Sequence, residues 1–576
     1  MRYKVIADLY ENLSSTTKRL EKTAILSTFL LQISEEDSYI LYLLLGEIYP
    51  DYDERKIGIS EQTVIKAISK ATGIPEKKVI EEWKKIGDLG DVAEKLTSKK
   101  KQQTLHSQTL TVDKVLTNLR KLPELEGKGT IDKKLGLITE LLTSASDIES
   151  KYIVRTLIGD LRIGIKESTI RESISKAFFY DEIEANEKVQ DAIDKSNDMV
   201  EVFLISKKSR GKISSLDSIS LQAGKPIKAM LVQKAKNIEE GFTIVGKPCA
   251  IEYKYDGFRL IIHKNKKEIK LFTRKLENVT KQFPEVTEYI EKYVDADTAI
   301  LDTEAVGFDS KTKEYLPFQN ISQRIRRKYD IDEIQQKMPV EVNVFDIILY
   351  NGKSYLDVPF IKRSELIKKI IQNHPFKIIH SKQIITDSES KAKEFFKQAL
   401  EHHQEGIIMK NLDAPYKPGR RVGNMLKIKP QEKDLDLVIT GAEYGTGKRS
   451  GWLSSFIVSC YDEENKKFLE IGKVSTGLKE KSESVIEESN LTFEELTKLV
   501  KPHIINEEGK NVVVKPKLIL SVTYQEIQIS PNYSSGFALR FPRFTALRVD
   551  KPLSEIATLE EVEKDFQNQK RNWKYG

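Results

Sequence analysis

The first third of the chain carries apolar residues at helical spacing, for example Val5, Leu9 and Leu13. Side chains three and four positions apart share one face of a helix, so this pattern predicts amphipathic helices packed through their apolar faces. Prolines and glycines, which interrupt helices, are scarce in this segment. We therefore expect an all-α domain over residues 1–215. A polar break, KLTSKKKQQTLHSQ, begins at residue 95, and the Lys/Ser-rich stretch KKSRGKISS from residue 207 marks the first boundary.

Beyond this boundary the pattern changes to short runs that are rich in β-branched and aromatic residues. They are GFRLIIHK, EIKLFTR, AILDTEAVGF, VEVNVFDIILY and GIIMK. Such runs are typical of strands, and helical patches such as EFFKQALEHH come between them. The combination predicts an α+β domain over residues 216–432.

From residue 433 onwards, runs of strand character dominate. They are DLDLVITGAEY, SSFIVSCYD, FLEIGKVS and KLILSVTYQEIQI, and one helical patch, LTFEELTKLV, begins at residue 491. Many short strands separated by turn residues favour a small β-barrel. We expect this barrel over residues 433–576, so the fold class is multidomain.

Composition agrees with a multidomain protein and adds little about its function. The chain has 576 residues, enough for several domains, and 94 basic against 87 acidic residues give a net charge of +7. So small a basic excess permits a polyanionic partner without requiring one. The longest apolar runs, such as YILYLLLG from residue 39, fall well short of the roughly 20 residues of a membrane span. We expect a soluble protein without a signal peptide.

Two cysteines, Cys249 and Cys460, lie far apart in the sequence. Neither has a partner at metal-ligand spacing, so a zinc site built on cysteines is excluded and a disulfide framework is unsupported. We expect two buried free thiols and an intracellular protein.

One glycine-rich stretch, GAEYGTGKRS at 441–450, is similar to a phosphate-binding P-loop. However, five residues separate Gly441 from Gly447, and Arg449 stands where Ser or Thr would bind magnesium. We interpret the stretch as a loop between strands with a basic tip.

The stretch EYKYDGFRL at 252–260 holds the strongest candidate for chemistry, because Lys254 stands between Glu252 and Asp256. Most such runs are solvated strand edges with alternating charges. The alternative is a nucleophile. Deprotonating an ordinary lysine at neutral pH costs roughly 4–5 kcal/mol, and nearby cations, desolvation or a bound metal lower that cost. The chain offers cations at Arg259 and Arg274 and in a cluster formed by Arg420, Arg421, Lys427 and Lys429.

The order of motifs favours the nucleophile. EYKYDGFR, LFTRKLENVT, LDTEAVGFD, VFDIILYNG, EGIIMK, MLKIKP and LRFPRFTALRVDK follow one another over about 300 residues. This series resembles that of the ATP-dependent DNA ligases of the archaeal type, within the covalent nucleotidyltransferases. DLRIGIKESTI at 160 is also similar to the helical DNA-binding domain of that family. The resemblance implies an all-α DNA-binding domain, an α+β nucleotidyltransferase (adenylation) domain and a β-barrel OB-fold domain.

The resemblance also implies a role for each matched residue on the nucleotide. Lys254 would attack the α-phosphate of ATP to form a lysyl-AMP. Glu252 would accept a hydrogen bond from the adenine amino group, and Phe345 would stack on the base. Arg259 and Arg274 would contact the ribose and phosphate side.

Further matched residues would handle the metal and the triphosphate. Glu304 would meet the ribose hydroxyl and, with Glu405, hold Mg²⁺, for which Mn²⁺ is an alternative. Arg421, Lys427 and Lys429 would neutralise the triphosphate.

The last motif implies contacts with the outer phosphates, and two positions of the chain differ from the usual family pattern. Arg540 and Lys551 would reach the β and γ phosphates. Met425 stands where many relatives have tryptophan, which we expect to change packing only. Ser521 stands where many have glutamate, which leaves any further metal or DNA contact there open.

The expected function is an ATP-dependent DNA ligase that seals nicks in duplex DNA during replication, repair and recombination. RNA capping enzymes and RNA ligases share the lysine motif but lack the helical domain. NAD-dependent ligases usually carry a four-cysteine zinc finger that two cysteines cannot build. The alternative that is not an enzyme is a nucleic-acid binding module that has lost catalysis.

The expected partners follow from the same family. They are nicked double-stranded DNA and a sliding clamp, for which the weak candidate segment is QQTLHSQTL at 102–110, with Leu105 and His106. We expect a monomer that binds no membrane and is cytoplasmic or nucleoid-associated. The sequence leaves open whether other nucleotides replace ATP, as they do in some archaeal relatives.

Overall fold

The computed structural model describes residues 1–53, 55–98, 109–125, 127, 129–180, 183–316, 318–325, 331–430, 433–446, 449, 451–480 and 491–574. The chain divides into two compact units, Met1–Ile428 and Lys429–Gly576. The segment proposed above for a sliding clamp falls mostly on residues outside those described.

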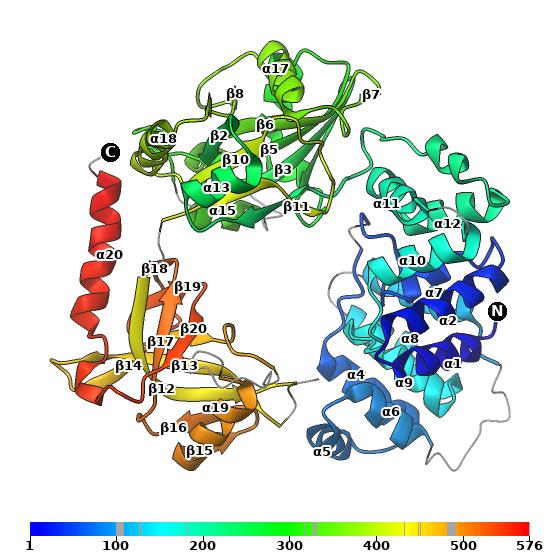
Figure 1. The fold of residues 1–576 in the computed structure, drawn as a ribbon. Helices are drawn as coiled ribbons and strands as arrows, with labels where there is room; N and C mark the ends of the chain where they lie inside the picture. The colour runs from blue at the N-terminus through cyan, green and yellow to red at the C-terminus, as the bar shows by residue number, and fades with distance from the viewer. Residues whose placement is uncertain are drawn as a thin grey trace. The chain divides into compact units, whose positions relative to one another are not determined.

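Helices make up the N-terminal part of the first unit (Figure 1). They are α1 (Tyr3–Ser14), α2 (Arg19–Gln32), α3 (Ile40–Leu43), α4 (Glu61–Thr72), α5 (Glu76–Ile86), α6 (Leu89–Thr97), α7 (Val112–Glu124), α8 (Thr130–Ser144), α9 (Asp147–Ile158), α10 (Glu167–Phe178), α11 (Ala185–Ser196), α12 (Met199–Lys208) and the 3₁₀ turn η1 (Ile213–Ser218). Their buried apolar faces form one hydrophobic cluster. The predicted helical character of this region is therefore confirmed.

Local signals set the helix ends. At α9, the Ser146 side chain accepts from the backbone N–H of Glu149 while the Glu149 carboxylate accepts from the Ser146 N–H, a reciprocal cap. The helix ends at Gly159, whose φ of 72° is a left-handed conformation that glycine adopts without steric cost.

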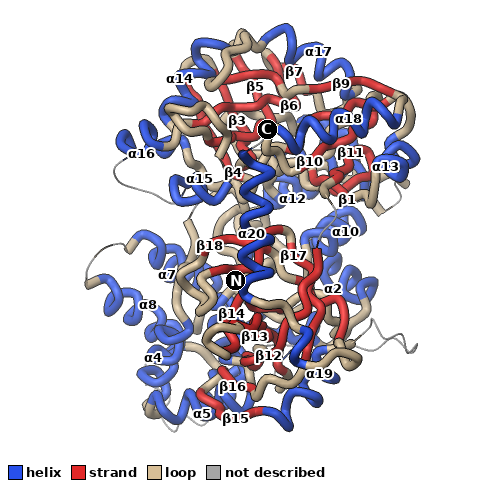
Figure 2. Tube along the Cα trace, turned by 90° about the vertical axis from the view of Figure 1, so that its left-hand side faces the viewer, coloured by secondary structure: helices blue, strands red, loops and turns tan. Residues whose placement is uncertain are grey.

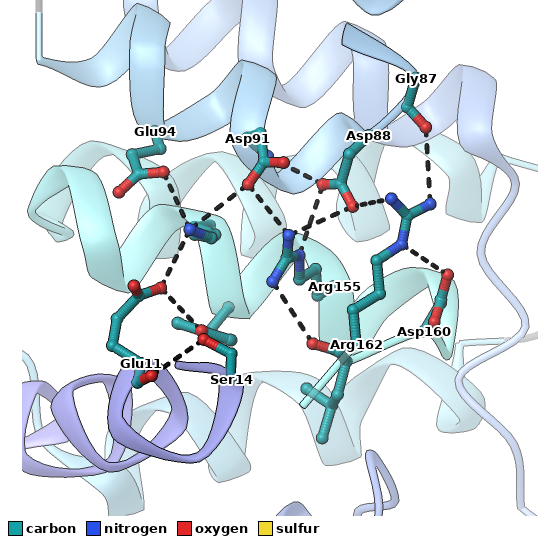
Figure 3. Close-up of polar contacts among 12 residues, drawn as sticks. Glu11, Ser14, Gly87, Asp88, Asp91, Glu94, Arg155, Asp160 and Arg162 are labelled. Carbon is teal, nitrogen blue, oxygen red and sulfur yellow. Dashed lines mark hydrogen bonds and ion pairs between the residues drawn. The ribbon is translucent and has the colours of Figure 1, made fainter. Parts of the chain in front are cut away.

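Ion pairs join α6 to α9 and to the loop after α9 (Figure 3). Asp88 caps α6 and also pairs with Arg155 at 3.3 Å and Arg162 at 2.6 Å. Gly90 lies where a Cβ would come 2.7 Å from the Arg155 Cγ, so the close packing of these helices requires glycine there. The motif DLRIGIKESTI thus contributes Arg162 to a packed polar cluster.

Two sheets make up the rest of the first unit. One has the strand order β1-β11-β10-β2-β9, and the other β4-β3-β5-β6-β7, with β8 paired to β6. The strands are β1 (Leu231–Lys234), β2 (Cys249–Lys254), β3 (Phe258–Asn265), β4 (Glu268–Thr273), β5 (Thr298–Gly307), β6 (Val340–Tyr350), β7 (Lys353–Ser354), β8 (Ile378–His380), β9 (Gln383–Thr386), β10 (Gly406–Asn411) and β11 (Arg421–Ile428).

Helices pack against the strands of both sheets (Figure 2). They are α13 (Ile238–Val245), η2 (Thr280–Gln282), α14 (Pro284–Tyr293), α15 (Phe318–Ile325), α17 (Phe360–Ile370) and α18 (Glu389–Glu401). A further helix of this region is α16 (Ile331–Lys337). The strand runs expected from the sequence coincide with β3, β4, β5, β6 and β10, and all but the last two residues of EFFKQALEHH fall in α18. Arg274, expected on a strand, directly follows β4.

The second unit is rich in sheet. Its main sheet has the order β14-β13-β12-β16-β15, and β17 pairs with both β12 and β20, while β18 and β19 form a separate pair. The elements are β12 (Lys433–Tyr444), β13 (Leu453–Asp462), β14 (Lys467–Val474), α19 (Phe493–Val500), η4 (Lys501–His503), β15 (Ile504–Glu508), β16 (Asn511–Val514), β17 (Ile519–Tyr524), β18 (Glu526–Ile529), β19 (Phe537–Arg540), β20 (Arg543–Leu547), η5 (Leu553–Glu555) and α20 (Leu559–Lys574). The sequence did not predict α20.

Cys249 and Cys460 are both buried free thiols, as expected. Burial raises the pKa of each thiol to about 12, which keeps both protonated at neutral pH. Within the described ranges no helix is both long and apolar enough to cross a membrane.

Candidate active site

A cavity of about 1000 Å³ opens in the first unit between strands of both sheets. Seven of the predicted site residues line it: Glu252, Lys254, Arg259, Arg274, Glu304, Phe345 and Lys427. They come from β2, β3, the turn after β4, β5, β6 and β11. The fold therefore brings together side chains that lie up to 175 residues apart in the sequence, from 252 to 427.

Lys254 is the last residue of β2 and lies opposite Gly406 at the start of β10. Its backbone carbonyl accepts a hydrogen bond from the N–H of Glu405 at 2.9 Å, and its Nζ lies 2.7 Å from Glu405 Oε2. The pairing of β2 with β10 thus carries both members of the ion pair to one place.

Gly257, in the same motif, is required by close packing of strands. A Cβ at this position would lie 2.3 Å from the carbonyl oxygen of Ala305 on β5. No side chain fits at that distance, so glycine lets β3 begin directly beside β5 after the chain has passed Lys254.

Glu304 lies opposite Arg259 in the pairing of β5 with β3. Burial raises its pKa to about 7, the positive charges of Lys254 and Arg259 oppose that rise, and Glu405 and Asp302 add to it. A carboxyl group that titrates near neutral pH beside a candidate nucleophile is typical of functional sites.

The adenine end assigned by the sequence has its own polar cluster. Glu252 is buried, and its carboxylate accepts from Gln383 at 2.8 Å and pairs with Lys410 at 2.7 Å. Burial raises the pKa of Glu252, and the charge of Lys410 opposes that rise. Lys410 also donates to the Phe345 carbonyl at 3.1 Å and lies 4.9 Å from the centre of its ring.

The remaining predicted cations lie in different surroundings. Arg420 pairs with Asp191 at 2.8 Å and Asp194 at 2.6 Å on α11 of the same unit. Arg421 begins β11, and its side chain is outside the described part of the structure. Lys429 belongs to the second unit, where its Nζ donates to Gln525 at 3.3 Å.

The two cations of the last motif lie in the second unit and have acidic partners there. Arg540 pairs with Glu526 at 2.8 Å, and Lys551 pairs with Asp436 at 2.6 Å. Arg548, which the sequence did not single out, reaches the same Asp436 oxygen at 2.9 Å.

Glu304 and Glu405 would be suitable for magnesium. That ion binds proteins through one or two carboxylates and completes its shell with substrate phosphates and water. Glu405 pairs with Lys254 at 2.7 Å, and the charges of both residues influence the pKa of Glu304, so the two carboxylates lie near the same amine. Among the described residues no group of three or more His, Cys, Asp and Glu side chains could hold a metal by itself. Such a site would therefore depend on the phosphates of its substrate.

Comparison with known proteins identifies the family. Residues 2–175 match the family described as DNA ligase N terminus, residues 229–429 match the ATP dependent DNA ligase domain, and residues 449–551 match the ATP dependent DNA ligase C terminal region. The chain belongs to the ATP-dependent DNA ligases. It is accordingly an enzyme, a DNA ligase that uses ATP, in a family that acts on nicked DNA.

Relatives that match over their full length are named DNA ligase. A DNA ligase of Nanoarchaeum equitans is 43% identical over 570 residues, covering 99% of both chains, and one of Thermococcus fumicolans is 38% identical over 574 residues with the same coverage. The solved structure titled Pmar-Lig_PreS3 is similar in fold, with a TM-score of 0.59 and 17% identity, over 94% of this chain and 99% of the other.

Sequence reasoning missed four residues that contact members of the candidate site: Lys410, Asp302 and Tyr416, which are buried, and Gln383, which is half-buried. Two of them stand inside quoted motifs, Lys410 at the end of EGIIMK and Asp302 two residues before Glu304 in LDTE. Alternation along β5 places Asp302 and Glu304 on one face, which was the available signal. Gln383 and Tyr416 lie outside the motifs.

Proposed function

We propose that the chain seals a 5′-phosphate to a 3′-hydroxyl at nicks in duplex DNA through three nucleotidyl transfers. First, the neutral Lys254 amine attacks the α-phosphorus of ATP, the N–P bond forms, the nitrogen gives up one proton to water, and pyrophosphate leaves with the bridging oxygen. Second, an oxygen of the DNA 5′-phosphate attacks that phosphorus, the N–P bond breaks, and the lysine nitrogen takes up a proton from water as it leaves. Third, the 3′-hydroxyl attacks the activated 5′-phosphate, loses its proton, and AMP leaves.

The observation that carries the proposal is the place of Lys254 at the wall of the cavity, where its Nζ lies 2.7 Å from Glu405 Oε2 and its charge opposes the rise in the pKa of Glu304. Phosphoryl transfer depends mainly on position and on compensation of charge. Arg259, Arg274 and Lys427 supply positive charge at the same cavity.

The other site residues take the roles that the motif series assigns. Glu252 accepts from the adenine amino group, Phe345 stacks on the base, and Arg259 and Arg274 meet the ribose and phosphates. Glu304 and Glu405 would hold Mg²⁺ or Mn²⁺, and the ion would supply positive charge that offsets the charge of the triphosphate.

The proposal extends to the organisation of the chain. Residues 1–215 form an all-α DNA-binding domain, 216–432 the adenylation domain and 433–576 an OB-fold barrel. Support for the barrel comes from β12, which pairs with β13 along one edge and with β16 and β17 along the other. Arg421 and Lys429 neutralise phosphates, the ligase is an intracellular monomer, and a sliding clamp is a partner.

A labelling experiment tests the first transfer. The protein is incubated with Mg²⁺ and ATP radiolabelled at the α-phosphate and then run on a denaturing gel. Wild type should retain label, and Lys254→Ala and Lys254→Arg should retain none. Lys267→Ala removes an exposed lysine of the same domain and should label like wild type.

Two further reactions test which step needs Lys254 and which nucleotide is the donor. Lys254→Ala should still seal a nick that already carries AMP on its 5′-phosphate, because the third transfer does not use the amine. Parallel reactions with GTP and NAD define the donor. Label on purified Lys254→Ala would contradict the assignment of the nucleophile, and absence of label on wild type would contradict the proposed lysyl-AMP intermediate.

A further inference from the structure

Arg259 is held at the cavity wall by a closed ring of hydrogen bonds. Its Nε donates to Asp302 Oδ1 at 2.8 Å, its Nη2 donates to Asp302 Oδ2, and its Nη1 donates to the Met230 carbonyl at 2.7 Å. Tyr416 closes the ring. Its hydroxyl donates to Asp302 Oδ2 at 2.6 Å and accepts from the Met230 N–H at 2.9 Å.

Distant parts of the chain supply this ring. Arg259 on β3 lies opposite Glu304 on β5, so Asp302, two residues earlier on the same face, is its diagonal neighbour. Tyr416 comes from the segment between β10 and β11, and its own N–H donates to the Leu356 carbonyl at 2.7 Å. The tyrosine is therefore fixed at its backbone as well as at its hydroxyl.

Burial makes the ring rigid and keeps the tyrosine a donor. Met230, Asp302 and Tyr416 are all buried. Burial, followed by the negative charge of Asp302, raises the pKa of Tyr416 well above its ordinary value, so the hydroxyl stays protonated. Because desolvation offsets the attraction within a buried ion pair, such a pair is weak evidence for stability. We therefore explain the buried Arg259–Asp302 pair by the fixed orientation that it gives the guanidinium.

The ring leaves Arg259 with donors for a ligand. An arginine has five N–H groups, and three of them are used in the contacts among the described residues. Its guanidinium carbon lies 5.4 Å from the centre of the Phe345 ring, and both residues line the cavity. The guanidinium is therefore held at the cavity wall near Phe345, with two N–H groups left for a ligand.

We propose that Tyr416 and Asp302 are positioning residues that orient Arg259 toward the ribose and phosphates of bound ATP. This inference rests on the proposed function, in which Arg259 contacts that side of the nucleotide. Without the hydroxyl, Asp302 loses one donor and the Met230 N–H loses its acceptor, so the ring opens. The guanidinium then reaches its ligand less often, and small displacements of such groups are costly in catalysis.

The test compares Tyr416→Phe with a matched control. Tyr315→Phe also removes a hydroxyl that donates to a carboxylate, that of Glu341 at 2.7 Å, and Tyr315 does not line the cavity. Self-adenylylation is measured in single turnovers over a range of ATP concentrations. Tyr416→Phe should lower the ratio of the rate constant to the ATP dissociation constant by about 10-fold, the order expected for one hydrogen bond to a charged group. Tyr315→Phe should leave it near wild type.

A double-mutant cycle separates positioning from general damage. In an Arg259→Ala background, Tyr416→Phe should cause no further loss, because the group through which it acts is gone. The same fold-loss in both backgrounds, or a Tyr416→Phe protein equal to wild type, would overturn the inference. Asp302→Asn, of nearly equal size, replaces Tyr416→Phe in the cycle if that variant does not fold. Failure of the wild-type protein to become adenylylated would instead contradict the proposed function.

Discussion

Replacing Glu304 with glutamine should stabilise the first unit at alkaline pH. The pKa of Glu304 rises from its ordinary 4.5 to about 7, chiefly because of burial, even though Lys254 and Arg259 stand nearby. That difference of about 2.5, at about 1.4 kcal/mol for each pKa unit, corresponds to about 3–4 kcal/mol. The carboxyl group is partly open to the cavity, so solvent reduces the cost, and we expect a gain of about 1–3 kcal/mol.

The sign of the pH dependence follows from proton binding. Between pH 4.5 and about 7 the folded chain binds the Glu304 proton more tightly than the unfolded chain does, so the free energy of unfolding falls as the pH rises. Glutamine does not ionise and escapes this loss. The advantage of Glu304→Gln should therefore be small at pH 5 and fully present at pH 8.

Hydrogen exchange measures the change in stability at the strands that hold Glu304 and its neighbour Arg259. Opening free energies of the β5 and β3 amides are determined by mass spectrometry at both pH values, without nucleotide or divalent cation, for wild type and Glu304→Gln. Glu288→Gln, on the exposed side of α14, serves as the control and should show no gain. An equal gain at both pH values, or none at pH 8, would refute burial as the cause of the raised pKa.

Three other predictions concern the remaining parts of the chain. Changing Arg540 and Lys551 together to alanine should slow self-adenylylation more than sealing of a pre-adenylylated nick, and equal defects would argue against their role on the outer phosphates. Nick binding should weaken steeply with salt, by about 0.9 in the log-log slope for each neutralised phosphate, and a flat binding constant would contradict this. Gly90→Ala should lower the free energy of unfolding by about 1–3 kcal/mol because its Cβ overlaps the Arg155 side chain. Gly136→Ala, in α8 with open space around its Cβ, is the control and should be neutral or stabilising in a thermal melt.

Periodicity predicted the elements that carry the motifs and missed others. GFRLIIHK and VEVNVFDIILY predict strands because β-branched and aromatic residues fill them, and both runs coincide with strands, β3 and β6. The short strand β9 and the helix α20 were not predicted. α20, LEEVEKDFQNQKRNWK, consists mostly of charged and amide side chains, so its sequence shows few of the apolar positions on which a helix prediction depends.

The candidate site was predictable as a set of residues and much less as a geometry. The motif order named seven residues that prove to line one cavity. The contact between Tyr416 and Asp302 spans 114 residues, and no pattern within one sequence reveals such a pairing. Lys410 was missed for a physical reason. A lysine after the apolar run GIIM is normally placed in solvent, whereas here its Nζ is buried against Glu252 and the Phe345 carbonyl.

Ion pairs in the cavity differ in how readily a substrate can exchange them. Lys410 and Glu252 have side chains 4% and 3% exposed, so breaking that pair would leave a buried charge without a partner, at high cost. Lys254 and Glu405 are 24% and 14% exposed. In the proposed mechanism the Lys254–Glu405 pair must separate before the lysine attacks, and it is the more exposed of the two pairs. If Glu252 and Lys254 have the proposed roles, burial holds the Glu252 carboxylate in place for the base, while partial exposure lets Lys254 exchange Glu405 for a substrate phosphate.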